Sequence, residues 1–448
     1  MKHGVWVLLV AMARSLAVHR RNIVSPSGAT VALFGLVLAG CAGGDAGDRV
    51  ELRFWGLGRE GEVVAALARE FERENPDIVI RVQQIPWTAA HEKLLTAYVG
   101  DATPDLAQLG NTWVPEFSAV GALERLDPWI AASSTVSADG YFDGIWQTNV
   151  VDGGVHGLPW YVDTRVLFYR TDLLAAAGHD SVPATWREWR EAMQDIAGRT
   201  ADYAIFLPTN EWTQPVVFGL QAGSPLLGED GRFGAFSEPA FRDAFEFYVE
   251  LFRSGLAPTM SNIDMSNVYQ EFARGLFAMY ITGPWNIGEF ERRLPAAMEG
   301  KWATAPLPGP DGPASRVSLA GGASLVLFRA SEHKAEAWRF MEYLSRPDVQ
   351  FRFFQMTGDL PARLEAWQDS ALIGNRYARA FHEQLQRVVP TPKVPEWEQI
   401  ATKVYEAAEA VIRAGAPIEA TLEGLDAEVD RLLEKRRWLL AHDSANGS

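Results

Sequence analysis

Cysteine is almost absent from this sequence, whose 448 residues include a single one, Cys41. One thiol cannot form a disulfide within the chain or a thiolate metal cluster, so other forces must hold the fold together. Basic side chains are also in deficit, because 41 lysines and arginines face 57 acidic residues and give a formal net charge of −16. A surface of that sign repels nucleic acids and anionic lipids, so neither is expected as a direct ligand.

Long hydrophobic runs and low-complexity tracts are missing too. The apolar run at residues 29–38 is too short to cross a bilayer as a stable helix. No tract rich in proline, serine or glutamine marks a disordered arm, and hydrophobic residues make up 48% of the chain, as in an ordinary folded protein. A chain of this length exceeds one ordinary core, so we expect two large folded lobes.

The N-terminal segment combines the parts of an export signal. Arg20 and Arg21 precede the apolar run 29–38, and Leu-Ala-Gly-Cys follows at residues 38–41. This tetrapeptide resembles the lipobox of bacterial lipoproteins, in which signal cleavage leaves the cysteine as a lipid-modified first residue. We therefore expect residues 1–40 to be an export signal, Cys41 a lipid anchor and residues 41–48 a linker. The mature protein is then expected at the cell membrane, facing the periplasm or the cell exterior.

Signatures of catalysis and of metal binding are missing or incomplete. The eight histidines are scattered, and neither His-Glu pair, at 91–92 or 382–383, has the second histidine of a zinc-binding helix. Residues 331–334 match S-x-x-K, but Ser331 is better explained as a helix N-cap. We therefore expect no metal, no cofactor and no catalytic residue. Spacing alone cannot single out a glycosidase-like carboxylate pair, so an exported glycoside-active enzyme stays open as an alternative.

Short apolar runs alternate with amphipathic stretches along the chain, which is typical of an α/β fold with a mainly parallel sheet. Residues 52–55 and the β-branched run 78–82 predict strands with a helix between them. From about residue 395 the pattern is helical to the end. Further strands are predicted at residues 106–109, 166–169, 204–207, 277–281 and 325–328.

A glycine motif at residues 56–61, Gly-Leu-Gly-Arg-Glu-Gly, matches the dinucleotide-binding pattern G-x-G-x-x-G. In a dinucleotide site an acidic residue should end the second strand and hold the ribose, but here Asp77 precedes that strand. Arg59 and Glu60 also stand inside the turn, where a carboxylate would meet a pyrophosphate. We therefore do not expect a nucleotide at this motif.

Nine segments along the chain resemble the sugar-binding family of extracellular solute-binding proteins, to which maltose-binding protein belongs. They are residues 71–76, 104–106, 157–160, 163–170, 283–286 (Gly-Pro-Trp-Asn), 305–310, 321–322, 336–340 and 357–361. Each segment is short, but their order and spacing hold from residue 49 to about 435. The resemblance therefore covers nearly the whole chain after the signal segment.

The resemblance implies two α/β lobes that are joined by crossing segments and hold the ligand between them. The N-terminal lobe would comprise residues 49–160 and about 305–355, and the C-terminal lobe about 165–300 and 356–438. The first crossing would fall near residues 160–166 and the second near 303–308. Such a cleft lies at the carboxyl ends of strands, where open α/β sheets place their ligands.

The resemblance also implies a set of ligand-binding positions. Asp163 matches an acidic position on the first crossing that accepts hydrogen bonds from hydroxyls, Trp285 matches a stacking residue, and Trp397 is similar to a second stacking position. Aromatic rings suit the apolar C–H face of a sugar, while acids, amides and arginine discriminate among its hydroxyls. The complete set is Arg59, Glu60, Asn111, Thr112, Trp113, Asp163, Glu211, Trp212, Trp285, Gly321, Gly322 and Trp397.

The function that follows from the resemblance is capture of a small carbohydrate, possibly an α-linked disaccharide, for an ABC importer. The lobes would close around the sugar about a hinge, and the permease subunits would receive it. We expect a monomer that meets the membrane only through its lipid anchor and binds no nucleic acid. A sensory sugar-binding protein that docks on a receptor is the second alternative, beside the glycoside-active enzyme.

Overall fold

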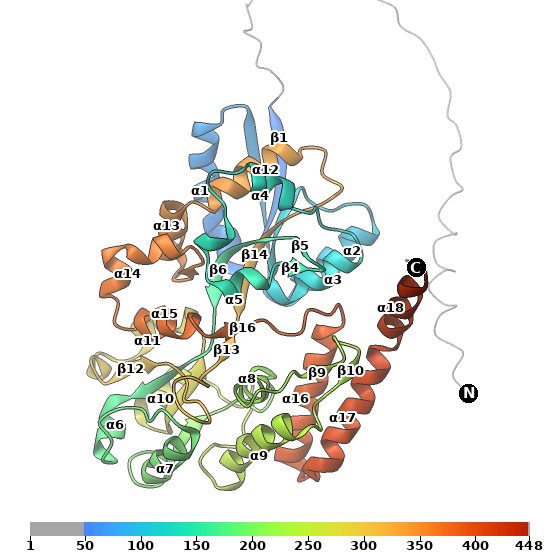
Figure 1. Ribbon diagram of the computed structural model, residues 1–448. Helices are drawn as coiled ribbons and strands as arrows, with labels where there is room; N and C mark the ends of the chain where they lie inside the picture. The colour runs from blue at the N-terminus through green and yellow to red at the C-terminus, as the bar shows by residue number, and fades with distance from the viewer. Residues whose placement is uncertain (1–48, 447–448) are drawn as a thin grey trace, which may run out of the picture. The chain divides into compact units, whose positions relative to one another are not determined.

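The computed structural model describes residues 49–446 (Figure 1), so the predicted export signal, the linker up to residue 48 and the anchor Cys41 lie outside the described residues. Within that range the predicted α/β architecture is confirmed. No helix in the range is both long and apolar enough to cross a membrane.

The first part of the described chain runs from β1 to β6. Its elements are β1 (Val50–Leu57), α1 (Gly58–Glu74), β2 (Ile78–Ile85), α2 (Trp87–Val99), β3 (Leu106–Gly110), the 3-10 helix η1 (Asn111–Trp113), α3 (Val114–Ala119), α4 (Asp127–Ala132), α5 (Asp143–Gln147), β4 (Val150–Val151), β5 (Gly154–Val155) and β6 (Leu158–Asp163).

The chain continues into a second set of elements, which ends at β12. These are β7 (Val166–Arg170), α6 (Thr171–Ala176), α7 (Trp186–Ile196), β8 (Tyr203–Phe206), α8 (Thr213–Gln221), β9 (Leu227–Gly228), β10 (Phe233–Gly234), α9 (Pro239–Arg253), α10 (Val268–Arg274), β11 (Phe277–Thr282), α11 (Trp285–Arg293) and β12 (Trp302–Ala305).

The last third returns to the first set and then ends in long helices. Its elements are β13 (Ser318–Leu319), β14 (Gly321–Leu327), α12 (Lys334–Leu344), α13 (Pro347–Thr357), β15 (Leu360–Pro361), α14 (Ser370–Gly374), α15 (Ala378–Leu385), β16 (Val388–Val389), α16 (Trp397–Ala414), α17 (Ile418–Leu432) and α18 (Glu434–Asn446).

Two sheets organise these elements into separate layers. The larger has the strand order β15-β6-β14-β3-β1-β2, and the smaller has the order β12-β7-β11-β8. Helices α1, α12 and α13 pack with the larger sheet, while α8, α9, α16 and α17 pack with one another beside the smaller one, as Figure 1 shows. The chain passes from the larger sheet to the smaller at residues 164–165 and returns after β12.

The sheets are mixed, so the expectation of a mainly parallel sheet is wrong. β1 runs parallel to β2 and β3, but β14 is antiparallel to both β3 and β6. The reason is topological, because β14 enters the larger sheet from the second set of elements and therefore runs in the opposite direction. Leu360–Pro361 also pairs with β6, so this sheet reaches beyond residue 355, where the sequence suggested the lobe ends.

The glycine motif 56–61 has a packing role at the start of α1. A Cβ on Gly61 would lie 2.5 Å from the carbonyl oxygen of Gly56, and Gly58 has a φ of +49°. The strand and the helix therefore approach more closely than any side chain would allow. The apolar stripe Val64, Leu67 and Phe71 is then buried against the sheet.

Candidate ligand-binding cleft

A cavity of about 400 Å³ lies where the carboxyl ends of β1, β3 and β6 face the start of α11. Residues immediately after these strands point side chains into it, as expected for an open α/β sheet. Nine of the predicted site residues line this cleft: Glu60, Asn111, Thr112, Trp113, Asp163, Trp212, Trp285, Gly321 and Gly322. The chain thus brings together residues up to 338 positions apart, from Glu60 to Glu398.

Trp285 is the aromatic side chain that the cleft leaves most accessible. It is the first residue of α11 and is 43% exposed, although it is a large hydrophobic residue. Its ring lies over Gly283, where a Cβ would come within 1.9 Å of the ring. The guanidinium carbon of Arg165 lies 4.8 Å from the ring centroid, within the range of a cation–π contact. The indole is therefore held in place while part of its surface stays available.

Asp163 and Arg165 form an ion pair on the segment that joins the two sheets. The Arg165 Nη1 donates to Asp163 Oδ1 at 2.5 Å, and the backbone N–H of Arg165 donates to Ser318 Oγ at 3.2 Å. Burial raises the pKa of Asp163 above its ordinary value, and the charge of Arg165 offsets this only in part. The pair places a charged acceptor and a charged donor side by side in the cleft.

Glu60 is held by two side-chain donors in the cleft wall. Tyr161 Oη donates to Glu60 Oε1 at 3.2 Å, and Trp87 Nε1 lies 3.4 Å from Oε2. Gln108 supports this arrangement, because its Nε2 donates to Tyr161 Oη at 3.1 Å while its Oε1 accepts from the Leu57 backbone at 2.8 Å. Burial raises the pKa of Glu60 despite these hydrogen bonds.

Asp359 adds a further carboxylate to the same wall. It lies just before β15 and is 9% exposed. Burial raises the pKa of Asp359 to about 7, and the negative charges of Glu60 and Asp163 add to the rise, while Thr357 and Arg59 oppose it. The cleft is therefore rich in acceptor oxygens that water does not fully solvate.

One hydrogen bond joins the two sides of the cleft directly. Thr112 Oγ1 in η1 donates to Glu398 Oε1 in α16 at 2.6 Å. Behind it, Trp113 packs edge-on against Trp87 at 5.8 Å and tilted against the ring of His91 at 5.1 Å. The wall of the cleft that belongs to the larger sheet is thus a packed aromatic surface, in which Trp87 and His91 both contact Trp113.

Three predicted site residues do not line this cleft. Arg59 lies in an adjoining hollow and donates to the Met356 carbonyl at 3.0 Å, and Glu211 accepts from Asn262 Nδ2 at 2.8 Å. The placement of Trp397 as a stacking residue is wrong for this structure, because its side chain is 1% exposed. It packs edge-on against Trp212 at 5.6 Å and so supports that residue from inside the core.

Several residues that the structure brings to the cleft were not predicted from the sequence. Arg165 and Asp359 stand in segments that carry the family resemblance, so attention to every charged residue of those segments would have found them. Glu398 directly follows Trp397, and only its helical register turns it toward the cleft while its neighbour is buried. The missed lining residues are Trp87, Gly110, Tyr161, Val162, Arg165, Thr213, Pro284, Leu319, Ala320, Asp359, Thr391 and Glu398.

Among residues 49–446 no group of three or more histidine, cysteine or acidic side chains has an arrangement that could hold a metal ion. The cleft instead combines exposed aromatic surface with carboxylates, the amide group of Asn111 and one guanidinium. This set of groups suits a neutral molecule that has both apolar faces and many hydroxyl groups.

The chain is similar to known binding proteins over most of its length. The bacterial extracellular solute-binding protein family matches residues 55–351. The solved structure of the sugar-binding protein MalE from Xanthomonas citri is 47% identical and covers 88% of this chain and 99% of its own, with a TM-score of 0.85. The diacetylchitobiose-binding protein DasA of Streptomyces coelicolor is 25% identical over 83% of this chain and 87% of its own. The maltodextrin-binding protein MdxE of Bacillus subtilis is 24% identical over 76% and 80%.

The fold and these relatives define a two-lobed extracellular sugar-binding protein of the type that serves ABC transporters. The chain belongs to the family of bacterial extracellular solute-binding proteins, in its maltose-binding-protein-like group. The resemblance found in the sequence is thereby confirmed, and so is the fold class that it implied.

Proposed function

We propose that this protein is the lipid-anchored binding subunit of an ABC importer, which captures a small carbohydrate by hinge closure and delivers it to the permease. A unit the size of an α-linked disaccharide would occupy the cleft. The observation that carries the proposal is the position of Trp285, whose exposed ring shares the cavity with Asp163, Glu60 and Asp359.

The chemistry of these groups fits both the apolar faces and the hydroxyl groups of a sugar. An indole face supplies flat apolar area for the C–H side of a pyranose ring, and buried carboxylates accept hydrogen bonds from its hydroxyls. Arg165 can donate to ring or hydroxyl oxygens from the same segment that carries Asp163. The names of two relatives, a diacetylchitobiose-binding and a maltodextrin-binding protein, support a carbohydrate as the ligand class.

Binding and release without chemistry is the action that we propose. The relatives are named as binding proteins, and a ligand that contacts both sides of the cleft favours the closed arrangement of the lobes. The glycoside-active alternative predicts that the pure protein releases free sugar from an oligosaccharide.

Thermal unfolding in the presence of a sugar panel tests the proposal. A ligand that binds only the folded state raises the unfolding midpoint, by an amount that grows with its concentration. We expect a shift with at least one di- or oligosaccharide, and no release of product in the same mixture. A panel without any shift would contradict the carbohydrate ligand, and steady release of sugar would favour the enzyme. For the anchor, Cys41→Ser should move the protein from the membrane fraction to the soluble fraction.

A further inference from the structure

Gln108 is a fully buried polar side chain that stands behind the wall of the cleft. It lies in β3 with 0% of its surface exposed and does not itself line the cavity. The paired residues of β1 with β3 are Phe54 and Trp55, so Leu57 at the end of β1 lies beyond them. The side chain of Gln108 takes over there, because its Oε1 accepts from the Leu57 backbone N–H at 2.8 Å.

The hydrogen bonds that run from Leu57 to Glu60 have only one possible direction. A backbone N–H can only donate, so the amide oxygen of Gln108 must face Leu57 and its nitrogen must face Tyr161. That nitrogen can only donate as well, so Tyr161 Oη accepts from it at 3.1 Å. The hydroxyl then donates its single proton to Glu60 Oε1 at 3.2 Å. We call this chain of hydrogen bonds the Glu60 relay.

The ring of Tyr161 is held so that its hydroxyl stays directed at Glu60. It is 7% exposed, stacks on Phe353 at 6.1 Å and is tilted against Trp160 at 6.0 Å. On the other oxygen of Glu60, Trp87 Nε1 lies 3.4 Å from Oε2 and can only donate. Both donors are directed at the carboxylate, so neither of them donates to a ligand at this place.

Charges of both signs face Glu60, and the relay changes none of them. They are Arg59 on its own helix, the Asp163–Arg165 pair, Asp359, and Glu289, Glu291 and Arg292 of α11 across the adjoining hollow. Burial raises the pKa of Glu60, while hydrogen bonds, including those from Trp87 and Tyr161, lower it. With the charges kept in place, the pKa of Glu60 therefore reports whether its donors are directed at it.

We infer that Gln108 is a positioning residue for ligand specificity, because it directs the Tyr161 hydroxyl at Glu60 and leaves the carboxylate as an obligatory acceptor. The ligand must then present a hydrogen-bond donor at this place, as a sugar hydroxyl does, and an ether oxygen, a carboxylate or a phosphate is rejected. The inference rests on the proposed function, since Glu60 lines the same cleft. A partly buried charged acceptor that loses its partner discriminates strongly against such analogues.

Two substitutions interrupt the relay at different points. Tyr161→Phe removes the hydroxyl and keeps the ring, and Gln108→Met removes the amide at nearly the same side-chain length. Gln384→Met is the matched control for the second. Gln384 is 1% exposed, accepts from the Leu307 N–H at 3.0 Å and donates to the Arg316 carbonyl at 2.8 Å, outside the cleft. It loses the same kind of buried hydrogen bonds.

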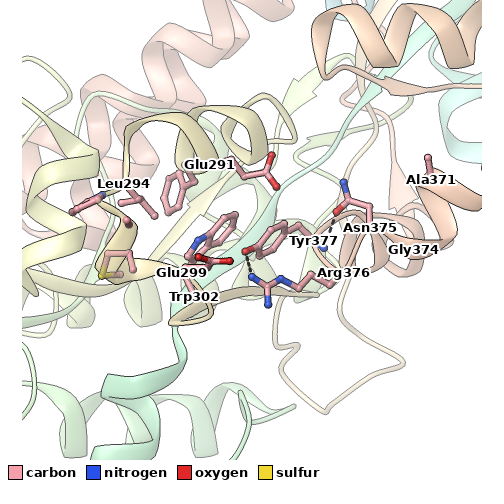
Figure 2. A pocket seen from close by; sticks show the side chains of 13 residues that line it. Glu291, Leu294, Glu299, Trp302, Ala371, Gly374, Asn375, Arg376 and Tyr377 are labelled. Carbon is pink, nitrogen blue, oxygen red and sulfur yellow. Dashed lines mark hydrogen bonds between the residues drawn. The ribbon is translucent and has the colours of Figure 1, made fainter.

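Tyr377→Phe is the matched control for the loss of a tyrosine hydroxyl. Figure 2 shows Tyr377 in a separate hollow of about 690 Å³, where Arg376 donates to its hydroxyl. Tyr377 lines neither the cleft nor the hollow that adjoins it. Its substitution therefore removes a comparable hydrogen bond without touching Glu60.

Carbon-13 NMR of the glutamate carboxyl groups, in the full protein without sugar, follows the titration of Glu60, and Glu60→Gln identifies its signal. We expect Tyr161→Phe and Gln108→Met to raise the pKa of Glu60, because a donor that favours the charged carboxylate is lost or no longer directed at it. Gln384→Met and Tyr377→Phe should leave this pKa at the parental value. A merely structural Gln108 would lower stability in Gln108→Met, as in Gln384→Met, and leave the pKa unchanged.

Calorimetry with maltose, trehalose and diacetylchitobiose measures the consequence for binding. Because the charged carboxylate is the acceptor, affinity should fall as the pH falls through the pKa of Glu60, and this fall should begin at higher pH in both relay variants. Derivatives with one hydroxyl replaced by fluorine, which cannot donate, locate the contact. In the parent one such replacement should weaken binding about tenfold, and in Glu60→Ala that loss should disappear.

The outcomes separate this inference from the proposed function. An equal pKa of Glu60 in the parent, Tyr161→Phe and Gln108→Met would overturn the relay, whether or not a sugar binds. A raised pKa with an unchanged pH dependence of sugar affinity, or a fluorine loss that survives in Glu60→Ala, would overturn the role in specificity. A parent protein that binds no sugar at any pH would contradict the proposed function, and the role in specificity with it.

Discussion

At the scale of single residues, Trp285 is the one exposed large hydrophobic side chain among those that line the cleft. A fully packed tryptophan contributes to folding, whereas this one is 43% exposed inside a cleft. We expect Trp285→Ala to weaken sugar binding by about 1–4 kcal/mol, as for an aromatic anchor, with little loss of stability. Trp438→Ala is the control, because Trp438 is 58% exposed on α18, outside the cleft. Equal affinities of parent and Trp285→Ala by calorimetry would remove Trp285 from the site.

The raised pKa of Asp359 predicts that the stability of the fold depends on pH. Its carboxyl group has an ordinary pKa of 3.8 and a pKa of about 7 in the fold, so the native state binds its proton more tightly than the unfolded state. The contribution of this group is therefore most favourable below pH 4 and is lost as the pH rises to 7. Asp359→Asn should be near neutral at pH 4 and stabilising at pH 8, on the order of 1–3 kcal/mol at about 1.4 kcal/mol per pKa unit.

Urea unfolding of both proteins at the two pH values measures this difference. The comparison cancels the other titrating groups, while Glu60, Asp163 and Arg59, whose charges act on Asp359, remain in both proteins. An equal difference in unfolding free energy at pH 4 and pH 8 would show that the carboxyl group of Asp359 is not perturbed.

At the scale of elements, the turn before α11 determines where Trp285 points. A Cβ on Gly283 would come within 1.9 Å of the indole, so Gly283→Ala must displace the ring. We expect this substitution to weaken binding nearly as much as Trp285→Ala, although the tryptophan is kept. Gly288→Ala on the same helix has free space around its Cβ and should bind normally. Normal binding by Gly283→Ala would mean that the orientation of the ring is unimportant.

Local sequence patterns predicted much of the fold. The predicted strands at 52–55, 78–82 and 106–109 lie within β1, β2 and β3, because alternating apolar residues and the breaks after them are local signals. The antiparallel direction of β14 had no such signal, since its neighbours β3 and β6 are more than 150 residues away in the chain. Strand order and direction depend on how distant segments meet.

The same distinction holds for the site. Glu60 and Asn111 were implied by the family resemblance, and both lie just beyond the carboxyl end of a strand, where open α/β sheets place their ligands. The positions of Trp397 and Glu398 could not be predicted from the sequence, because the packing of α16 against α8 determines which of these two neighbours is buried. The sequence identified the helix but not the face that it turns to the cleft.

At the scale of the whole molecule, we propose that a bound sugar draws the two lobes together. The first crossing carries Asp163 and Arg165, and Thr112 already bonds Glu398 across the cleft, so a bound sugar would add contacts to an existing junction. Closed lobes present a surface that differs from that of the open form, and such a difference would allow a permease to distinguish loaded from empty protein.

Small-angle scattering of the delipidated protein, with and without the sugar that gives the largest thermal shift, tests this claim most directly. Because contacts made only in the closed form couple binding to closure, we predict that the radius of gyration decreases on saturation with the sugar. Asp163→Ala, which removes a proposed sugar contact on the crossing segment, should need more sugar for the same decrease. A radius of gyration that stays constant at saturating sugar would contradict hinge closure.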